Sequence, residues 1–254
     1  MVVEFERKDR VALITLNRPE ARNAVNADVA AGIEAAIDQF ESDPELWVAI
    51  LTANGPTFCA GADLKEIAAG NLGGLSTKKG GFAGLVRRAR SKPLIAAIGG
   101  SALAGGTEIA LAWDLIVCSD ETQFGLPEVK RSLAAAAGGL FRLPRAIGMA
   151  PAMEVILTGD PLSASDALAL GMVNKVVPTE EVISASMALA ERIAANAPLA
   201  VQASLRVASR ALADEDEVLW KTSYKEISAL AKTEDYKEGP KAFVEKRSPN
   251  WKGR

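Results

Sequence analysis

The sequence contains no histidine and only two cysteines, and these absences exclude several kinds of chemistry. Without histidine there is no Ser-His-Asp or Cys-His catalytic arrangement, no His-ligated zinc and no imidazole proton shuttle. Cys59 and Cys118 lie far apart in apolar stretches, so we expect buried inert thiols and neither a disulfide framework nor a CxxC motif. Acid–base chemistry therefore falls to carboxylates, lysine, tyrosine, cysteine or water.

A strong charge of one sign and a long apolar run are also missing. The 29 basic and 32 acidic residues give a net charge of −3, which argues against general nucleic-acid binding. The longest uncharged run, Pro93 to Thr107, is too short and too rich in glycine to span a membrane. The charged N-terminus has no apolar signal region, which predicts a cytoplasmic protein. A length of 254 residues suits one large domain or two small ones.

Apolar runs bounded by turn residues predict that strands and helices alternate in the first half. Strands are expected over Arg10–Asn17, Trp47–Thr52, Leu94–Ile98, Asp114–Ser119 and Val173–Val177, and helices over Asn26–Phe40 and Gly105–Ala112. Continuous apolar strands with helical crossovers predict an α/β fold whose sheet is covered on both faces. The pattern then becomes almost wholly helical, with helices expected over Glu180–Asn196, Leu199–Leu212 and Glu215–Lys232.

The segment Gly70–Gly84 holds six glycines in fifteen residues, too many for it to pack as a helix. Its place between two motif-bearing segments favours a mobile lid near a ligand, and a plain flexible surface loop is the alternative.

Two turns built of small residues, Phe58–Leu64 and Gly99–Glu108, each lead from a predicted strand into a predicted helix. A ligand can approach the backbone closely there, and the free N–H groups of a helix N-terminus favour negative charge. Two such donors that converge on one point would form an oxyanion hole. Small residues at strand–helix turns also serve packing alone, so the pair of turns is a stronger signal than either one.

Glu108 and Glu128 each lie among apolar residues. A carboxyl group in such surroundings is either a capping or ion-pairing group or an acid–base group with a raised pKa. Two carboxylates beside one oxyanion hole would suit the addition or removal of water, because one activates the water and the other handles the α-carbon proton.

Three segments resemble the crotonase (enoyl-CoA hydratase/isomerase) family in their order and spacing: FCAGADLKE (58–66), AGGTE (104–108) and FGLPE (124–128). The similarity runs from LNRPEARNA (16–24) to the closing EGPKAFVEKRSPNWKGR (238–254). The resemblance implies a spiral of ββα units over residues 1–180 that carries the acyl-CoA site. It also implies a helical region over residues 181–254 that forms homotrimers, commonly paired into hexamers, and covers the CoA.

The resemblance also implies the roles of individual residues. Family members act on acyl-CoA thioesters, in which coenzyme A is part of the substrate, and no further cofactor, metal, nucleic acid or membrane is expected. The oxyanion-hole amides match Ala62 and Gly105, and the two hydratase glutamates match Glu108 and Glu128. The substrate-binding positions match Arg22, Ala24, Ala60, Asp63, Leu64, Pro127, Ala136, Phe243 and Lys246. The last two often reach CoA across a subunit boundary, and a solvated surface charge is the alternative for Arg22 and Lys246.

The sequence departs from the usual pattern after Glu128, where Ala135-Ala136 stands in place of Pro-Gly. An N–H group near Ala136 would help to hold the water, and alanine would be strained there if the position needs a positive φ. The resemblance favours an enoyl-CoA hydratase. The alternatives are a carnitinyl-CoA dehydratase, which several segments resemble, an enoyl-CoA isomerase, and a non-catalytic acyl-CoA-binding protein.

Overall fold

The computed structural model describes all residues 1–254 and is built around a six-stranded sheet in the order β1-β2-β3-β7-β9-β12. Its strands are β1 (Val3–Lys8), β2 (Val11–Leu16), β3 (Val48–Ala53), β7 (Leu94–Ile98), β9 (Leu115–Ser119) and β12 (Lys175–Val177). Only β1 and β2 are antiparallel, and all other neighbours in this sheet are parallel. The predicted α/β fold is confirmed.

Alternate residues of the sheet pack into two separate apolar cores. On β3, Ala49 and Leu51 join α1 (Ala27–Ser42), whereas Val48 and Ile50 join the core that contains α7 (Val182–Ala194). Asn26 caps α1 by accepting a hydrogen bond from the N–H of Val29 at 3.0 Å. The sheet is therefore covered on both faces, as its continuous apolar strands predict.

The chain also forms a smaller four-stranded sheet, in the order β11-β10-β8-β4. Its strands are β4 (Thr57–Cys59), β8 (Ser101–Leu103), β10 (Gln123–Gly125) and β11 (Leu162–Ser163). Three units repeat one order: a long strand in the large sheet, a short strand in the small sheet, then a helix. The three helices are α2 (Leu64–Ala68), α3 (Gly105–Ala110) and the 3-10 helix η3 (Pro127–Arg131). This repetition is the spiral of ββα units that the resemblance implied.

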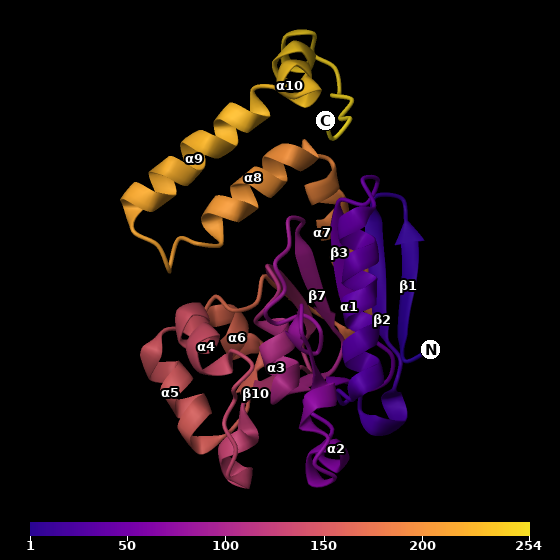
Figure 1. The fold of residues 1–254 in the computed structure, drawn as a ribbon, viewed down its shortest axis with the longest axis vertical. Helices are drawn as coiled ribbons and strands as arrows, with labels where there is room; N and C mark the ends of the chain where they lie inside the picture. The colour runs from indigo at the N-terminus through magenta and orange to yellow at the C-terminus, as the bar shows by residue number, and fades with distance from the viewer.

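The remaining helices complete the spiral and then leave it. They are α4 (Gly139–Ile147), α5 (Met149–Thr158), α6 (Ala164–Ala169), α8 (Pro198–Ala208), α9 (Asp216–Leu230) and α10 (Glu234–Val244), with short 3-10 turns η1 (Pro19–Ala21) and η4 (Thr179–Glu181). Figure 1 shows α8, α9 and α10 as an arm set off from the sheets, and α7 behind the large sheet. The division at residue 180 stays a prediction. No helix combines the length and the apolar character needed to cross a membrane.

The glycine-rich segment 70–84 forms a small ordered hairpin. The 3-10 helix η2 (Leu72–Leu75) leads into the antiparallel strands β5 (Ser76–Thr77) and β6 (Gly81–Phe82). Leu75 and Ala83 are buried, so the hairpin is anchored against the core and not a free surface loop. Whether it opens and closes as a lid stays a prediction.

Candidate active site

The small sheet brings together the three segments that carry the predicted catalytic residues. Strands β4, β8 and β10 are parallel neighbours, so their carboxyl ends lie along one edge of the sheet. Ala62 follows β4, Gly105 follows β8 and Glu128 follows β10, each at or just before the start of a helix. Segments that are distant in the sequence therefore meet at one edge.

The two small-residue turns touch each other. A Cβ atom placed on Gly61 would lie 2.7 Å from the Gly105 nitrogen, and one placed on Gly105 would lie 3.2 Å from the Gly61 Cα. The bridge between Val25 and Ala62 uses the Gly61 carbonyl and the Asp63 N–H, so the Ala62 N–H has no backbone acceptor. Gly105 opens α3, whose first-turn amides lack acceptors one turn earlier.

The residue before Gly105 has an unusual backbone conformation. Ala104 has φ 53° and ψ −126°, a region that alanine rarely adopts, and its N–H donates to the Gly125 carbonyl at 2.8 Å. The side chain of Thr107 also donates to that carbonyl, at 2.9 Å. These bonds tie the turn that presents the Gly105 amide to the end of β10.

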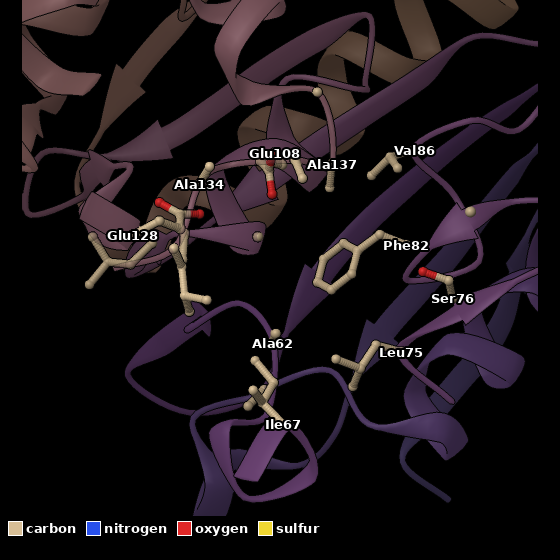
Figure 2. Close-up of a pocket in the computed structure, with 18 of the residues that line it drawn as sticks. Ala62, Ile67, Leu75, Ser76, Phe82, Val86, Glu108, Glu128, Ala134 and Ala137 are labelled. Carbon is tan, nitrogen blue, oxygen red and sulfur yellow. The ribbon is translucent and has the colours of Figure 1, made fainter. Parts of the chain in front are cut away.

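One cavity of about 990 Å³ covers this edge of the sheet. Figure 2 shows Glu108 and Glu128 on one side of the cavity, Ala62 and Ile67 on the opposite side, and the Phe82 ring projecting between them. Ten of the thirteen predicted site residues line it: Arg22, Ala24, Ala60, Ala62, Leu64, Gly105, Glu108, Pro127, Glu128 and Ala136. Leu72, Leu75, Ser76, Thr77, Gly81 and Phe82 of the glycine-rich hairpin also line it.

Glu108 is almost fully buried on α3, and its Oε1 accepts a hydrogen bond from the Gly139 N–H at 2.9 Å. The pKa of Glu108 is raised to about 7, mainly by burial and also by the charge of Glu128, whereas the Gly139 amide and Arg142 oppose the rise. The carboxyl group is thus poised to gain or lose a proton near neutral pH.

Glu128 is half-buried on η3, and its Oε2 is buried without a hydrogen-bond partner. Burial raises the pKa of this carboxyl group as well, against the charge of Arg131. A buried acceptor that the protein leaves unpaired is available to a water molecule or a substrate.

Ala136 is free of the backbone strain that its replacement of glycine suggested. It is absent from the positive-φ residues, and in this segment Ser132 and Gly138 take that conformation instead, with φ 55° and 115°. The Ala136 N–H donates to the Ala134 carbonyl at 2.8 Å. Ala136 lines the cavity, but in this structure its N–H is already occupied.

Asp63 lies behind the cavity wall and not in it. Its Oδ2 pairs with Arg18 at 2.7 Å, and its Oδ1 accepts from the Lys65 N–H and caps α2. Arg18 also donates to the Ala24 carbonyl at 3.0 Å. The pair links the segment of Arg22 and Ala24 to the turn of Ala62, so in this chain Asp63 supports the site from outside the cavity.

Phe243 and Lys246 do not line the cavity. Phe243 is 85% exposed on α10 and Lys246 follows that helix, on the arm that Figure 1 shows apart from the sheets. Contact with a ligand in the cavity of a neighbouring subunit stays a prediction for both residues.

The sequence did not point to Arg142 and Phe82 as site residues. Arg142 lies on α4, and its Nη1 and Nη2 donate to the carbonyls of Ala137 and Val86 at 3.3 and 2.6 Å. A Cβ atom on Gly105 would lie 2.5 Å from two ring atoms of Phe82. Both residues come from segments whose position depends on tertiary packing. For Phe82, the one signal in the sequence was that the glycine-rich segment lies between two motifs. No three His, Cys, Asp or Glu side chains gather where they could hold a metal ion.

Comparison with known proteins agrees with this geometry. The family model described as "Enoyl-CoA hydratase/isomerase" matches residues 6–254. The mevalonyl-coenzyme A hydratase of Aspergillus fumigatus is 41% identical, over 95% of this chain and 91% of its own. The carnitinyl-CoA dehydratase of Proteus mirabilis is 42% identical, over 95% of this chain and 94% of its own.

A solved structure of an enoyl-CoA hydratase from Mycobacterium tuberculosis H37Rv superposes with a TM-score of 0.95. It is 46% identical, and the match covers 100% of this chain and 99% of that one. Both the sequence and the spiral fold are thus shared over the full length, and the chain belongs to the enoyl-CoA hydratase/isomerase family, the crotonase family of enzymes.

Proposed function

We propose that this crotonase-family enzyme is an enoyl-CoA hydratase, which adds water reversibly to a 2-enoyl-CoA thioester to give a 3-hydroxyacyl-CoA. The observation that carries the proposal is the meeting of the Ala62 and Gly105 turns with two buried carboxyl groups in one cavity. That combination supplies both the charge stabilisation and the proton transfers that hydration needs.

The Ala62 and Gly105 N–H groups bind the thioester carbonyl oxygen in this proposal. Their hydrogen bonds draw electron density from the C2–C3 double bond and stabilise the negative charge that develops on the oxygen as C3 is attacked. Fixed backbone dipoles in a water-excluded site need no reorganisation during the reaction, and one such donor is worth about 10² to 10³ in rate. The bonds that hold the Ala104 turn to Gly125 keep the donor in place.

Glu108 and Glu128 handle the water. Glu108 takes a proton from the water as its oxygen attacks C3, and Glu128 gives a proton to C2, so the two carbons gain the elements of one water molecule. Raised pKa values suit both roles. A carboxylate with a raised pKa is a stronger base than an ordinary one, and a carboxyl group with a raised pKa keeps its proton more readily and can donate it as an acid. The unpaired Oε2 of Glu128 faces no competing protein donor.

Two other reactions of the family are the nearest alternatives. The carnitinyl-CoA dehydratase of P. mirabilis, at 42% identity, makes a trimethylammonium-bearing acyl chain the second candidate. Double-bond isomerisation can proceed with a single acid, and the presence of both glutamates in the cavity favours water chemistry over it. The A. fumigatus relative is named for a mevalonyl thioester, so substituted acyl chains occur among the relatives.

We also propose that the enzyme assembles as a homotrimer or as a pair of trimers. Helix α9 has no buried residue, although Val218, Trp220, Tyr224 and Ile227 project from it. Large apolar side chains left exposed along one helix are typical of a surface that another subunit covers. In such an assembly, the arm of one subunit would bring its Phe243 and Lys246 to the cavity of another subunit. Within the single chain, these two residues do not line the cavity.

The experiment is hydration of crotonyl-CoA, followed as loss of enoyl absorbance, by the wild-type enzyme and two variants. Glu108→Gln and Glu128→Gln each lower kcat by about 10² to 10⁴, because each removes one proton-transfer group without changing its shape. The exposed Glu121→Gln is the matched control and keeps full activity. Full activity in Glu128→Gln, with its fold intact by circular dichroism, would sink the two-glutamate mechanism.

A further inference from the structure

One end of the cavity holds an arginine, Arg142, close to the catalytic candidate Glu108. Arg142 is half-buried, lines the cavity, and donates to the carbonyls of Val86 and Ala137. Figure 2 places Val86 and Ala137 together, away from Ala62 and Ile67. With the thioester carbonyl of the proposed substrate at Ala62, Val86 and Ala137 lie where the part of the acyl chain beyond the reacting carbons can extend.

Arg142 has hydrogen-bonding capacity that the protein does not use. A guanidinium group carries five N–H donors, and the structure shows two hydrogen bonds from this one, both to neutral carbonyls. No carboxylate forms an ion pair with it, and the one acid whose charge acts on it is Glu108, which activates water in the proposed mechanism. A half-buried guanidinium that remains charged favours an oxygen acceptor.

The rest of the cavity offers nothing to a cationic acyl chain. Its only acids are Glu108 and Glu128, whose raised pKa values reduce their negative charge near neutral pH. Its only aromatic residues are Phe82 and Phe141, and no Trp or Tyr lines it. Quaternary ammonium groups are usually held by cages of several aromatic faces or by acids. This end of the cavity has no such cage, and its one acid, Glu108, lies beside the positive charge of Arg142.

We propose that the acyl end of the cavity selects chains that carry an oxygen acceptor, a hydroxyl or a carboxylate, for Arg142, and rejects chains that end in a trimethylammonium group. The inference rests on the proposed function in that the ligand is an acyl-CoA thioester. It assigns Arg142 as a specificity-determining residue and separates this enzyme from its carnitinyl-CoA dehydratase relatives in substrate class.

Binding of saturated thioesters, measured by titration calorimetry, tests the proposal without any turnover. Butyrobetainyl-CoA is compared with 5,5-dimethylhexanoyl-CoA, its uncharged isostere, and we expect the cation to bind at least about tenfold more weakly because its charge lies near that of Arg142. Glutaryl-CoA and 5-hydroxypentanoyl-CoA are compared with pentanoyl-CoA, and we expect at least one of them to bind about fivefold or more tightly, as a charge-assisted hydrogen bond predicts. Equal binding of the cation and its isostere, or no gain from either oxygen, overturns the proposal.

Two substitutions separate the charge of Arg142 from its structural contacts. Arg142→Gln reduces the discrimination between cation and isostere to about threefold or less, whereas Arg142→Lys keeps it, because the lysine retains the positive charge. Arg145→Gln, an exposed position on the same helix, is the control and leaves both ratios unchanged. If Arg142 only braces the Val86 and Ala137 segments, all affinities change together and the ratios stay fixed, which contradicts the proposal.

The same protein, assayed with crotonyl-CoA, distinguishes the two hypotheses. Selective binding without hydration of any enoyl-CoA would leave the selectivity of Arg142 standing and refute the hydratase proposal. Hydration of crotonyl-CoA with equal affinity for the cation and its isostere would do the reverse.

Discussion

The spiral core and the arm of α8–α10 bury their apolar side chains to very different extents. The main core includes residues from Val3 to Val173 and draws on strands of both sheets, whereas the arm's buried apolar residues are Pro198, Ala203 and Ala242. Large apolar side chains remain exposed along α9 and α10, with Trp220 at 59% and Phe243 at 85%. Both regions contain large apolar residues, but those of the core are buried and those of the arm are exposed to solvent in the single chain.

This difference matches the proposed division of the chain, in which the core carries the catalytic site and the arm contacts another subunit. The catalytic edge is held by buried contacts within one chain, such as the Arg18–Asp63 pair and the bonds to Gly125. The arm has few such contacts, which is expected of a segment that is completed by association. We therefore propose that the core carries out the chemistry and that the arm mediates assembly.

Replacing a phenylalanine by alanine in the core and in the arm gives the largest expected contrast in the free energy of unfolding. Phe124→Ala, in a side chain that is 1% exposed on β10, lowers the free energy of unfolding by about 3 to 5 kcal/mol because it leaves a cavity in the core. Phe243→Ala, in the exposed arm, lowers it by less than about 0.5 kcal/mol. Urea unfolding at one protein concentration measures both, and equal losses would show that the arm packs as tightly as the core.

A methyl group added where the Ala62 and Gly105 turns meet should lower catalytic activity without affecting the arm. In Gly105→Ala the new Cβ would lie 2.5 Å from the Phe82 ring and 3.2 Å from the Gly61 Cα, so the oxyanion donors are pushed apart. We expect kcat for crotonyl-CoA to fall by about 10² to 10³. Gly99→Ala is the control, because its Cβ would meet only Thr179 at 3.9 Å. Wild-type kcat in Gly105→Ala would remove these donors from the mechanism.

A charge on the arm tests its role in assembly. Trp220→Glu places a carboxylate on the apolar side of α9 and weakens the subunit interface by about 2 kcal/mol or more. Sedimentation velocity at micromolar concentration then shows a shift from trimer or hexamer toward monomer. Lys221→Glu, at the neighbouring exposed position, leaves the mass unchanged. A wild-type protein that is itself monomeric would end the assembly proposal.

The buried carboxyl group of Glu108 has a cost in stability that depends on pH. Its pKa is about 7 in the folded state against 4.5 for the ordinary group, so ionisation between these values weakens the fold. Glu108→Gln mimics the neutral acid, and it raises the free energy of unfolding by about 1 to 3 kcal/mol at pH 8. The gain disappears at pH 4, where the wild-type group is protonated in both states. Urea titrations at the two pH values check this, and an equal gain at both would contradict the raised pKa.

The core strands could be predicted from the sequence because their signal is local. Leu94–Ile98 is an unbroken apolar run and forms β7 with the bounds expected. Strands β4, β8 and β10 have three residues each, too few for a periodic pattern, yet they align the catalytic turns. The small-residue turns themselves were visible in the sequence, although their contact was not.

The parts of the site that could not be predicted depend on contacts between distant segments. Arg142 reaches the cavity because α4 packs against the segment of Val86, which lies 56 residues earlier. Asp63 matched a substrate-binding position, but its side chain pairs with Arg18 and does not line the cavity. Ala136 avoids a positive φ because Ser132 and Gly138 take the left-handed turns of that segment. In each case the decisive partner is far away in the sequence or is set by backbone geometry.

The most direct test of the account is the isotope content of the product formed from crotonyl-CoA in a mixture of D₂O and H₂¹⁸O. If the Ala62 and Gly105 amides and the two glutamates add water, mass spectrometry will show ¹⁸O on C3 and one deuterium on C2 of the 3-hydroxyacyl-CoA. Glu128→Gln will slow the appearance of both labels together. A product without ¹⁸O, with its double bond moved, would contradict the hydratase mechanism.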